Sequence, residues 1–423
     1  MDHFIVDGGR PLRGEVRVNG SKNAALPILI ATLLTDDPCI VRNVPDLRDI
    51  RTTFRLIDQL GKRVSRDGGE ARVDARGKLK TWASYDLVKQ MRASTLVAGP
   101  LLARFGRVSV ALPGGCAIGL RPIDIHLEAF KALGAKVSYA HGDVVLTGRL
   151  KPRSIRFRFP SVGATENIMM AAAATPGLTV LKNAAREPEI EDLADFLSKM
   201  GAHVSGAGTS TVRVRGLKRL RGVVHDVIPD RIEAGTFLIA AAMTQGDVRL
   251  LGARGDDLRA VLKALARSGA TVQEDESSVR VRMSRRPTPV NVATEPHPGF
   301  PTDLQAPWMA YMCLARGGSR IREDIFEKRF LHAAELARMG AWVRTEGSTA
   351  IMHGVPYLNG APVMASDIRA GAALVCAAVA ARGRTVIQRV YHIDRGYERI
   401  ERKLRTLGAR ISRVSRIPRL KPA

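Results

Sequence analysis

The chain has 423 residues, a length that indicates two or three domains rather than one. Its composition, 45% hydrophobic and 25% charged, excludes general disorder, and its longest apolar runs, such as 234–244, are too short to span a membrane. The early charged residues give no sign of a signal peptide and the four cysteines form no disulfide framework, so we expect a reducing, cytoplasmic location.

The chain is strongly basic, with 66 Lys and Arg residues against 41 Asp and Glu and a formal net charge of +25. Such a charge favours anionic partners, including nucleic acids. The basic residues are nevertheless spread along the chain, are concentrated only at 410–421, and come without an aromatic cluster that could stack on bases. We therefore expect a basic, solvated surface that favours small anionic substrates, and no nucleic-acid partner.

One five-residue pattern recurs six times along the chain and indicates the end of a helix. It consists of an apolar or small residue, Gly, a mostly small residue, any residue and then Val or Ile. A left-handed Gly ends a helix at little cost, and alternating residues such as Val212 and Val214 indicate a strand after it. The glycines are spaced by 67 to 73 residues and are Gly61, Gly134, Gly201, Gly269, Gly340 and Gly408. The chain is therefore predicted to contain six repeats of about 70 residues.

A second helix in each repeat is apolar on almost all sides, which predicts a position inside the protein. These apolar stretches begin near Asn23, Arg92, Thr165, Glu233, Asp303 and Arg369. Short strands, such as those expected at 14–18, 179–182 and 384–388, separate the two kinds of helix. Six repeats with buried helices and outer sheets indicate an α/β fold in two halves of three repeats, joined near 219–230.

Polar and basic residues gather where the predicted helices begin. Helix N-termini bind phosphate and carboxylate, because their N–H groups are free and the dipole end is positive. Ser, Thr and Asp commonly cap such ends, which is our interpretation of Asp46 and Thr165. A cation there opposes the dipole unless an anion lies between them, so the cations predict an anion site. They are Lys22, Arg92, Arg121, Arg329, Arg369 and Arg395.

The four cysteines differ in their surroundings. Cys116 lies in the glycine-rich stretch LPGGCAIG (112–119), which has the composition of a mobile lid, and a cation at Arg121 would favour its thiolate. This makes Cys116 a candidate acid or nucleophile. The other three, Cys39, Cys313 and Cys376, lie in apolar runs and are predicted to be buried. The histidines lack metal-binding spacing, so no metal site is expected.

Several long motifs resemble the UDP-N-acetylglucosamine 1-carboxyvinyltransferases, a branch of the EPSP synthase family, and cover nearly the whole chain. They include NGSKNAALPIL (19–29), LPGGCAIGLRPIDIHL (112–127), FPTDLQA (300–306) and YHIDRGYERIE (391–401). The resemblance implies an inside-out α/β barrel with two domains, 22–229 and 1–21 with 230–423, and an active site in the cleft between them. It also implies the small-molecule substrates UDP-N-acetylglucosamine and phosphoenolpyruvate, and no cofactor.

The implied reaction transfers the enolpyruvyl group of phosphoenolpyruvate to the sugar 3′-hydroxyl and releases phosphate, in the first committed step of peptidoglycan precursor synthesis. The resemblance implies that Cys116 donates a proton, that Asp303 takes the hydroxyl proton, and that Lys22 and Arg395 act with them. It implies substrate contacts, shared with Lys22 and Asp303, for Asn23, Arg92, Arg121, Pro122, Ile123, Asp124, Ile125, Phe159, Pro160, Ser161, Val162, Ile325, Arg329, Asp367 and Arg369.

The sequence departs from the family pattern in a few places. Phe159 and Pro160 stand where some members carry a Lys that reaches the nucleotide, Lys328 replaces a frequent Asn, and the basic tail after Ile411 has no implied role. Two alternatives stay open on the residues alone. The chain could act on shikimate 3-phosphate, as the sibling 3-phosphoshikimate 1-carboxyvinyltransferases do, although these lack the Cys-bearing loop. It could also bind nucleic acids or anionic surfaces.

Overall fold

The computed structural model describes residues 2–89, 91–111, 123–326 and 329–415, with Arg92 represented by its backbone only. These residues form two compact units, each with its own hydrophobic core. Unit N contains the described residues of 20–228, and unit C contains those of 2–19 and 229–415. In this described part of the chain, no helix combines the length and the apolar character that crossing a bilayer requires.

The six predicted helix-ending glycines all have a left-handed backbone, with φ between +88° and +112°. Residues with a side chain are strained in this region, whereas Gly is not. In each repeat one residue separates the helix end from this Gly. The helices are α2 (Arg48–Gln59), α5 (Asp124–Ala132), α7 (Pro188–Lys199), α9 (Arg259–Arg267), α11 (His332–Arg338) and α13 (Ile400–Thr406). The predicted six-fold repeat is confirmed.

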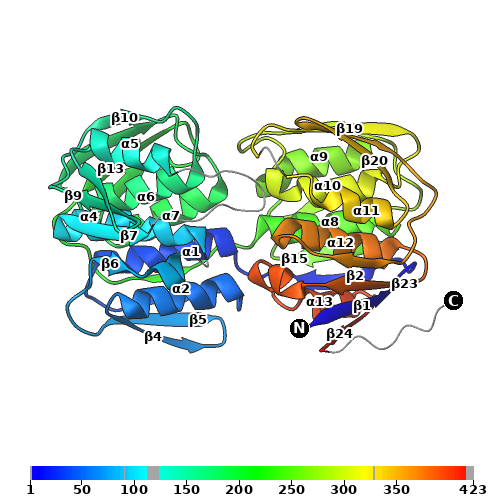
Figure 1. Cartoon of the computed structure of the whole chain (residues 1–423), viewed down its shortest axis with the longest axis horizontal. Helices are drawn as coiled ribbons and strands as arrows, with labels where there is room; N and C mark the ends of the chain where they lie inside the picture. Colours follow the sequence, from blue (N-terminus) through cyan, green and yellow to red (C-terminus); the bar gives the residue numbers. More distant parts are fainter. Residues whose placement is uncertain (1, 90, 112–122, 327–328, 416–423) are drawn as a thin grey trace. The chain divides into compact units, whose positions relative to one another are not determined.

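The second helix of each repeat is buried on nearly all sides, as its composition predicts. Unit N contains α1 (Lys22–Ala31), α4 (Ala98–Phe105) and α6 (Val162–Ala173), and unit C contains α8 (Arg231–Met243), α10 (Gln305–Met312) and α12 (Ile368–Ala380). In unit C these three helices pack against one another. Figure 1 shows them in the middle of that unit, with strands at its periphery.

Two of the buried helices begin later than predicted. The stretches η2 (Arg92–Val97) and η4 (Thr302–Leu304) are 3₁₀ turns, and α4 and α10 follow them. Pro100 and Pro307 explain where the regular helix starts, because each is the third residue of its α-helix. In the first helical turn the missing N–H of proline removes no intrahelical hydrogen bond, whereas an earlier start would place it deeper inside the helix.

Six four-stranded sheets surround these helices, three in each unit. In unit N the strand orders are β14-β3-β5-β4, β6-β7-β9-β8 and β10-β11-β13-β12. The strands are β3 (Cys39–Arg42), β4 (Lys62–Asp67), β5 (Glu70–Ala75), β6 (Trp82–Ala83), β7 (Arg107–Ala111), β8 (Lys136–Ala140), β9 (Asp143–Thr147), β10 (Ser154–Arg156), β11 (Gly177–Lys182), β12 (His203–Ser205), β13 (Thr211–Gly216) and β14 (Val224–Asp226). The short helices of this unit are η1 (Thr32–Leu34) and α3 (Tyr85–Val88).

Unit C repeats the design with strand orders β2-β15-β17-β16, β18-β19-β21-β20 and β22-β23-β1-β24. The strands are β1 (His3–Asp7), β2 (Arg13–Arg17), β15 (Asp247–Leu251), β16 (Thr271–Asp275), β17 (Ser278–Arg282), β18 (Val292–Thr294), β19 (Gly318–Glu323), β20 (Trp342–Glu346), β21 (Thr349–His353), β22 (Pro362–Met364), β23 (Arg384–Gln388) and β24 (Arg410–Val414). The short helices are η3 (Asp256–Leu258) and η5 (Val390–Arg395). In every sheet one edge strand is parallel to its neighbour and the other pairs are antiparallel.

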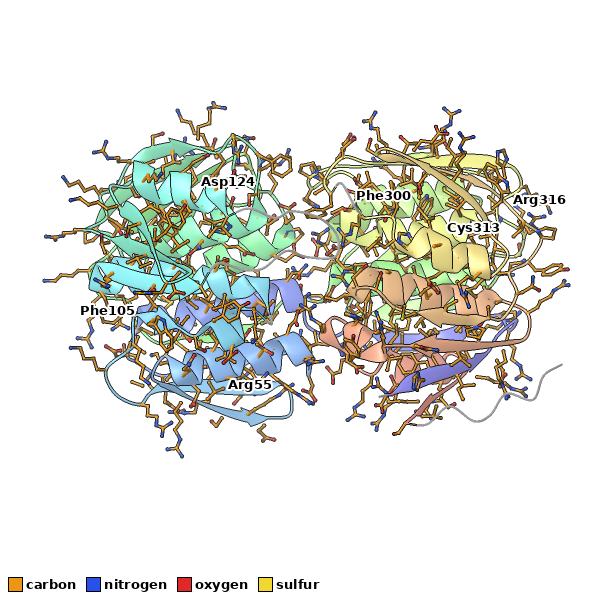
Figure 2. The ribbon with its side chains drawn as sticks, viewed as in Figure 1. Arg55, Phe105, Asp124, Phe300, Cys313 and Arg316 are labelled. Atoms are coloured by element: carbon orange, nitrogen blue, oxygen red, sulfur yellow. The ribbon has the colours of Figure 1, made fainter. Side chains whose placement is uncertain are left out.

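Strand alternation explains where the basic residues lie. In β13, Val212 and Val214 are buried against the core, while Arg213 and Arg215 between them are exposed. Figure 2 shows many side chains that end in nitrogen atoms projecting outward from the strands of each unit. The charge excess is therefore carried largely by outward-facing positions, while the helices inside stay apolar. Buried helices inside outer sheets confirm the predicted inside-out α/β architecture.

Candidate functional site

Several predicted site residues lie outside the described part of the chain. They are Cys116, Arg121 and Pro122, and for Arg92 only the backbone, in η2, is described. The other predicted residues form three groups, two in unit N and one in unit C.

The first group lies at the start of α1 in unit N. The Ser21 hydroxyl caps this helix by accepting the Ala24 N–H at 3.3 Å, which makes Lys22 the first helical residue. Lys22 is only 8% exposed, and its Nζ lies 3.7 Å from Oδ2 of buried Asp49 in the first turn of α2. This carboxylate offsets the cost of placing a cation at a helix N-terminus. Asn23 follows and is partly exposed, so the helix start carries an amine and an amide together.

The second group lies where α5 and α6 of unit N begin side by side. Asp124 is the first residue of α5, and Figure 2 labels its position. The Ser161 hydroxyl caps α6 by accepting the Ala164 N–H at 3.3 Å. A Cβ atom added to Gly163 would lie 3.4 Å from the His126 ring, so the two helix starts are in close contact. Two adjacent helix N-termini with their N–H groups are suited to an anion such as a diphosphate.

Ion pairs link α5 to the residues that precede α6 in this second group. Arg158 forms an ion pair with Asp124 and lies 3.6 Å from Glu128. Phe159, next to it, is 40% exposed and is one of the large apolar side chains on the surface. The structure thus brings together the predicted residues Ile123, Asp124, Ile125, Phe159, Pro160, Ser161 and Val162.

The third group lies in unit C and is built around the Asp303 carboxylate. Arg329 Nη2 donates to Asp303 Oδ1 at 2.5 Å, and Arg369 Nη2 donates to Asp303 Oδ2 at 3.0 Å. The two arginine side chains are each 5% exposed, whereas the Asp303 side chain is 26% exposed. The partly exposed Asp303 carboxylate is therefore hydrogen-bonded to two buried cations.

Arg369 is the most constrained cation of this group. It lies in the first turn of α12, which Asp367 caps by accepting the N–H groups of Arg369 and Ala370 at 2.9 and 3.0 Å. Burial works against its charge, but nearby Asp303 and Tyr397 outweigh this effect and raise the pKa of Arg369. Its Nη1 has no hydrogen-bond partner among the described residues. The group therefore contains a permanently charged guanidinium whose Nη1 can donate a hydrogen bond to a ligand.

Arg395 lies close to Arg369 but not where the sequence predicted. It is the last residue of η5 rather than the start of a helix, and α13 begins only at Ile400. Arg399, which lies between the two helices, has a left-handed φ of +44° and so breaks the helical conformation there. A Cβ atom on Gly396 would lie 3.6 Å from Arg369 Nη1, so the backbone next to Arg395 approaches that guanidinium.

Three other predictions about helix starts are wrong. Arg329 precedes α11 by three residues instead of beginning it. The N-cap position of α2 is Leu47 rather than Asp46, whose carboxylate pairs with Arg51 at 2.6 Å and with Arg66 at 3.1 Å. Thr165 lies inside α6, where its hydroxyl donates to the Ser161 carbonyl at 2.8 Å.

Three residues that support the third group were not predicted from the sequence. His332 is buried, and burial lowers its pKa to about 4, with Asp367 and Arg329 as its charged neighbours. The buried Tyr397 ring lies 5.4 Å from the Arg369 guanidinium, and its hydroxyl is 2.9 Å from that of Thr236. Glu323 is buried at the end of β19. An acid at an inward-facing strand position was the signal that could have revealed Glu323.

The three described cysteines are buried, as predicted. Cys39, Cys313 and Cys376 are almost fully shielded from solvent, and Figure 2 labels Cys313 in unit C. Burial raises the pKa of the Cys313 and Cys376 thiols to about 12. These thiols are therefore protonated and unreactive near neutral pH.

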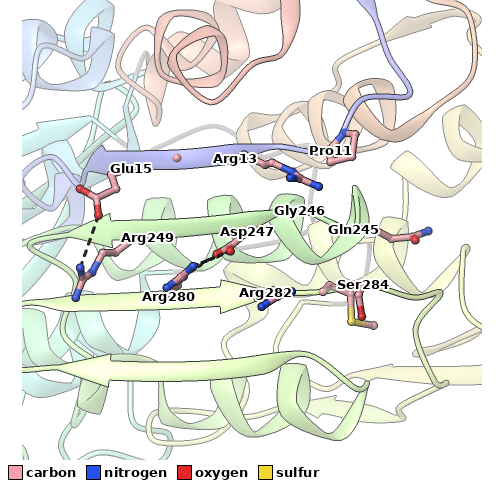
Figure 3. Close-up of a pocket in the computed structure, with 12 residues that line it drawn as sticks. Pro11, Arg13, Glu15, Gln245, Gly246, Asp247, Arg249, Arg280, Arg282 and Ser284 are labelled. Atoms are coloured by element: carbon pink, nitrogen blue, oxygen red, sulfur yellow. Dashed lines mark hydrogen bonds and ion pairs between the residues drawn. The ribbon is translucent and has the colours of Figure 1, made fainter.

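A separate hollow of about 600 Å³ lies over strands β2, β15 and β17 of unit C, and none of the described site residues lines it (Figure 3). Arg280 makes two hydrogen bonds of 2.7 Å to Asp247. Arg249 lies 3.7 Å from Glu15 and also pairs with Asp275. Both cations are thus already paired with acids of the same sheet.

Comparison with known proteins gives a consistent result over nearly the full length of the chain. The family model described as EPSP synthase (3-phosphoshikimate 1-carboxyvinyltransferase) matches residues 6–404. A UDP-N-acetylglucosamine 1-carboxyvinyltransferase of Endomicrobium trichonymphae is 52% identical over 97% of this chain and 99% of its own length. One from Trichlorobacter lovleyi is 54% identical over 98% of this chain and 100% of its own length.

Solved structures share the fold. The crystal structure of the enolpyruvyl transferase NikO from Streptomyces tendae superposes with a TM-score of 0.87 at 26% identity, covering 97% of this chain and 98% of that one. An EPSP synthase of Acinetobacter baumannii has a TM-score of 0.75 at 17% identity, covering 98% of this chain and 100% of that one. The second likeness concerns the fold alone.

Proposed function

The chain belongs to the EPSP synthase family and, within it, to the UDP-N-acetylglucosamine 1-carboxyvinyltransferases, and we propose that it transfers the enolpyruvyl group of phosphoenolpyruvate to the 3′-hydroxyl of UDP-N-acetylglucosamine. Phosphate leaves in the same reaction. The product enters the synthesis of peptidoglycan precursors.

One observation carries the proposal at the level of residues: the partly exposed Asp303 carboxylate is held by two buried arginines, at 2.5 and 3.0 Å. The reaction needs a base for the sugar hydroxyl and cations for a substrate that carries a phosphate and a carboxylate. Asp303 supplies the base, and Arg329 and Arg369 supply two of the cations. Lys22 and Arg395, with Arg121, complete the positive set in this proposal.

The arrangement around Asp303 suggests how substrate binding prepares the base. A carboxylate whose two oxygens both accept hydrogen bonds from guanidinium groups is a weak base, because its charged form is strongly favoured. Phosphoenolpyruvate carries two anionic groups that compete for the same guanidinium donors. Its binding therefore draws the arginines away from Asp303 and leaves this carboxylate free to accept the hydroxyl proton.

The reaction proceeds by addition and then elimination. The sugar oxygen bonds to the central carbon of phosphoenolpyruvate as Asp303 takes the hydroxyl proton, and Cys116 gives a proton to the methylene carbon. A proton then leaves the resulting methyl group, the carbon–oxygen bond to phosphate breaks, and the double bond forms again. Asp367, two residues before Arg369, is the candidate nearest to this methyl group. The cations stabilise the negative charge that builds up on the departing phosphate.

The paired starts of α5 and α6 provide the proposed site for the UDP-sugar. Ser161 caps α6 and Asp124 begins α5, so both helix N-termini offer backbone donors to the diphosphate. Phe159 contributes an exposed apolar surface for the nucleotide. Ile325 would pack near the nucleotide. We propose that residues 22–229 form one domain and that 1–21 with 230–423 form the other.

The proposed partners are these two small anionic substrates, without a nucleic acid, and the proposed location is the cytoplasm. Buried, unpaired thiols such as Cys313 and Cys376 suit a reducing compartment. The exposed arginines on the outer strands, such as Arg213 and Arg215, add a positive field that favours the approach of anions.

A comparison of two acceptors tests the proposed function. The purified protein is incubated with phosphoenolpyruvate and either UDP-N-acetylglucosamine or shikimate 3-phosphate, and phosphate release is followed. We expect release only with the UDP-sugar. Release with shikimate 3-phosphate alone would assign the chain to the sibling reaction instead.

A further inference from the structure

We propose that Glu323 is a positioning residue for the catalytic group of unit C: its buried carboxylate orients Arg329 through the Thr302 hydroxyl and fixes the turn that carries Ile325. This inference rests on the proposed function of Asp303 and Arg329. Glu323 lies between Asp303 and Arg329 in the sequence and acts on the reaction only through other side chains.

The position of Glu323 in its strand is unusual for an acid. Strand β19 alternates exposed and buried residues, so Glu323 shares the inward face with Ser319 and Ile321. It is only 2% exposed. A carboxylate placed in such a position is strongly destabilising unless hydrogen-bond donors satisfy its oxygens. The structure therefore has to supply those donors.

All of the donors that contact this carboxylate belong to segments of the candidate site. Glu323 Oε1 accepts the backbone N–H groups of Ile325 and Phe326, both at 3.0 Å. Glu323 Oε2 accepts the Thr302 hydroxyl at 2.8 Å. One oxygen thus fixes the turn that precedes Arg329, and the other fixes η4, which carries Asp303.

The chemistry of the partners sets the direction of every hydrogen bond in this chain of contacts. An ionised carboxylate only accepts and a guanidinium only donates. The Thr302 hydroxyl must therefore give its single proton to Glu323, and its oxygen is left to accept Arg329 Nη1, at 2.8 Å. Arg329 then donates its other terminal nitrogen, Nη2, to Asp303 Oδ1. The orientation of Arg329 depends on the charge at Glu323.

The variant Glu323→Gln distinguishes a positioning role from simple structural support. Glu323→Gln keeps the size of the side chain and can keep one oxygen for the two backbone N–H groups. Its amide nitrogen, however, is a donor that faces the Thr302 hydroxyl. The Thr302 oxygen must then accept from this amide, and its hydroxyl proton points toward Arg329. Because Arg329 Nη1 is also a donor, the hydrogen bond between Thr302 and Arg329 is lost. The variant therefore disturbs Arg329 while it leaves the packing of β19 almost unchanged.

Kinetics of phosphate release test the proposal with four single variants and one double variant. Glu323→Gln and Thr302→Val each interrupt the contact to Arg329, while Thr302→Ser preserves the hydroxyl. Thr294→Val is the matched control, because the Thr294 hydroxyl is also buried and accepts the Asp324 N–H of the same turn at 3.1 Å without contacting the catalytic group. The melting temperature of each variant is measured alongside.

We expect Glu323→Gln and Thr302→Val to lower kcat/KM for phosphoenolpyruvate by about tenfold or more, with a raised KM for this substrate. Thr302→Ser should stay within about threefold of the wild type, and the double variant Glu323→Gln/Thr302→Val should lose little more than the worse single variant. Thr294→Val should lower the melting temperature as much as Glu323→Gln does, but its kcat/KM should equal that of the wild type. Equal kinetic losses in Thr294→Val and Glu323→Gln, or none in Glu323→Gln, would overturn the proposal.

A crystal structure of Glu323→Gln provides a readout that does not depend on activity. We expect the Arg329 guanidinium to leave Thr302 and to lose its contact with Asp303. An unchanged Arg329 in this variant would refute the positioning role even if the proposed reaction were wrong. Absence of phosphate release in the wild type would refute the reaction alone, and the crystal structure would still decide the role of Glu323.

Discussion

Asp303 illustrates how a small number of charged atoms define the chemistry of the third group. Its carboxylate is 26% exposed, while the two arginines that contact it are almost completely buried. Two buried cations without an anion would be very costly, so we expect this carboxylate to stabilise the fold in addition to its proposed role as the base. The two roles can be separated, because an added anion can replace the first role but not the second.

Asp303→Asn should therefore have two effects. Loss of the base should lower kcat by about 10²- to 10⁴-fold. Loss of the negative charge should destabilise the protein by about 3–5 kcal/mol, because Arg329 and Arg369 stay buried without an anion. Phosphate release and thermal melting measure these effects. Added inorganic phosphate should restore part of the melting temperature but none of the activity, and a variant with wild-type kcat would show that Asp303 is not the base.

The cysteines allow a second prediction at this scale. Burial raises the pKa of the Cys313 and Cys376 thiols to about 12 and also raises that of Cys39, so none of the three should react near neutral pH. We expect iodoacetamide at pH 8 to label only Cys116 in the native protein and all four cysteines after denaturation. Peptide mapping by mass spectrometry reads the result, and native labelling of Cys39, Cys313 or Cys376 would contradict their burial.

His332 gives a prediction about pH. Burial lowers its pKa from 6.5 to about 4 in the folded protein, so the imidazole is neutral there while the unfolded chain binds a proton near pH 6.5. Stability that depends on the neutral form is complete above pH 6.5 and is lost as the pH falls toward 4. The loss should be on the order of 3 kcal/mol.

Melting temperatures between pH 7 and pH 4.5 test this dependence. His332→Gln should lose less of its melting temperature over this range than the wild type does. His203→Gln, at an exposed strand position, serves as the control and should follow the wild type. Parallel curves for all three proteins would mean that His332 is not the source of the acid sensitivity.

At the scale of elements, the repeat was the most predictable feature of the chain. A left-handed helix end is a local requirement that Gly meets best, so six spaced glycines suffice to locate six helix ends. The starts of the buried helices are less local. The regular part of α4 begins at Ala98 rather than near Arg92, and the 3₁₀ helix at Arg395 ends before a left-handed residue, Arg399, which no local pattern reveals.

The candidate site was predictable in its charged residues and unpredictable in its supports. The sequence motifs predict the charged residues Asp303, Arg329 and Arg369, which come from three separate segments. The structure then shows that these side chains are in contact. Glu323 and Tyr397 lie in charged stretches of the sequence, and charge alone does not distinguish them from their neighbours. Their roles arise from tertiary contacts, such as that between Glu323 and Thr302, which depend on how strands and helices pack.

Gly408 offers the cleanest test of the helix-ending glycines. Its φ is +94°, and an added Cβ atom would meet no atom within 4 Å, so a substitution there adds backbone strain without a clash. Gly408→Ala should destabilise the protein by about 1–2 kcal/mol. Gly408→Asn should cost less, because Asn tolerates left-handed backbone better than Ala. Urea denaturation measures both, and an Ala variant as stable as the wild type would contradict the strain argument.

At the scale of the whole molecule, each unit contains the same structural repeat three times, and the repeats differ in the polar residues at the starts of their buried helices. In unit N, α1 begins at Lys22 and α6 begins after Ser161. In unit C, α12 begins after Asp367, and Asp303 precedes α10. The same design thus presents an amine, backbone donors, a carboxylate and guanidinium groups at successive helix starts, while the outer strands carry the remaining charge.

Enolpyruvyl transfer by addition and elimination is tested by mass spectrometry of the product formed in D₂O from phosphoenolpyruvate and UDP-N-acetylglucosamine. A thiol at Cys116 would exchange its proton with the solvent and deliver deuterium to the methylene carbon. The methyl group that results then loses one of its three hydrogens, so we expect an enolpyruvyl-sugar nucleotide with deuterium in its vinyl group and an equal amount of phosphate. A product without deuterium, or phosphate release that does not require the UDP-sugar, would contradict it.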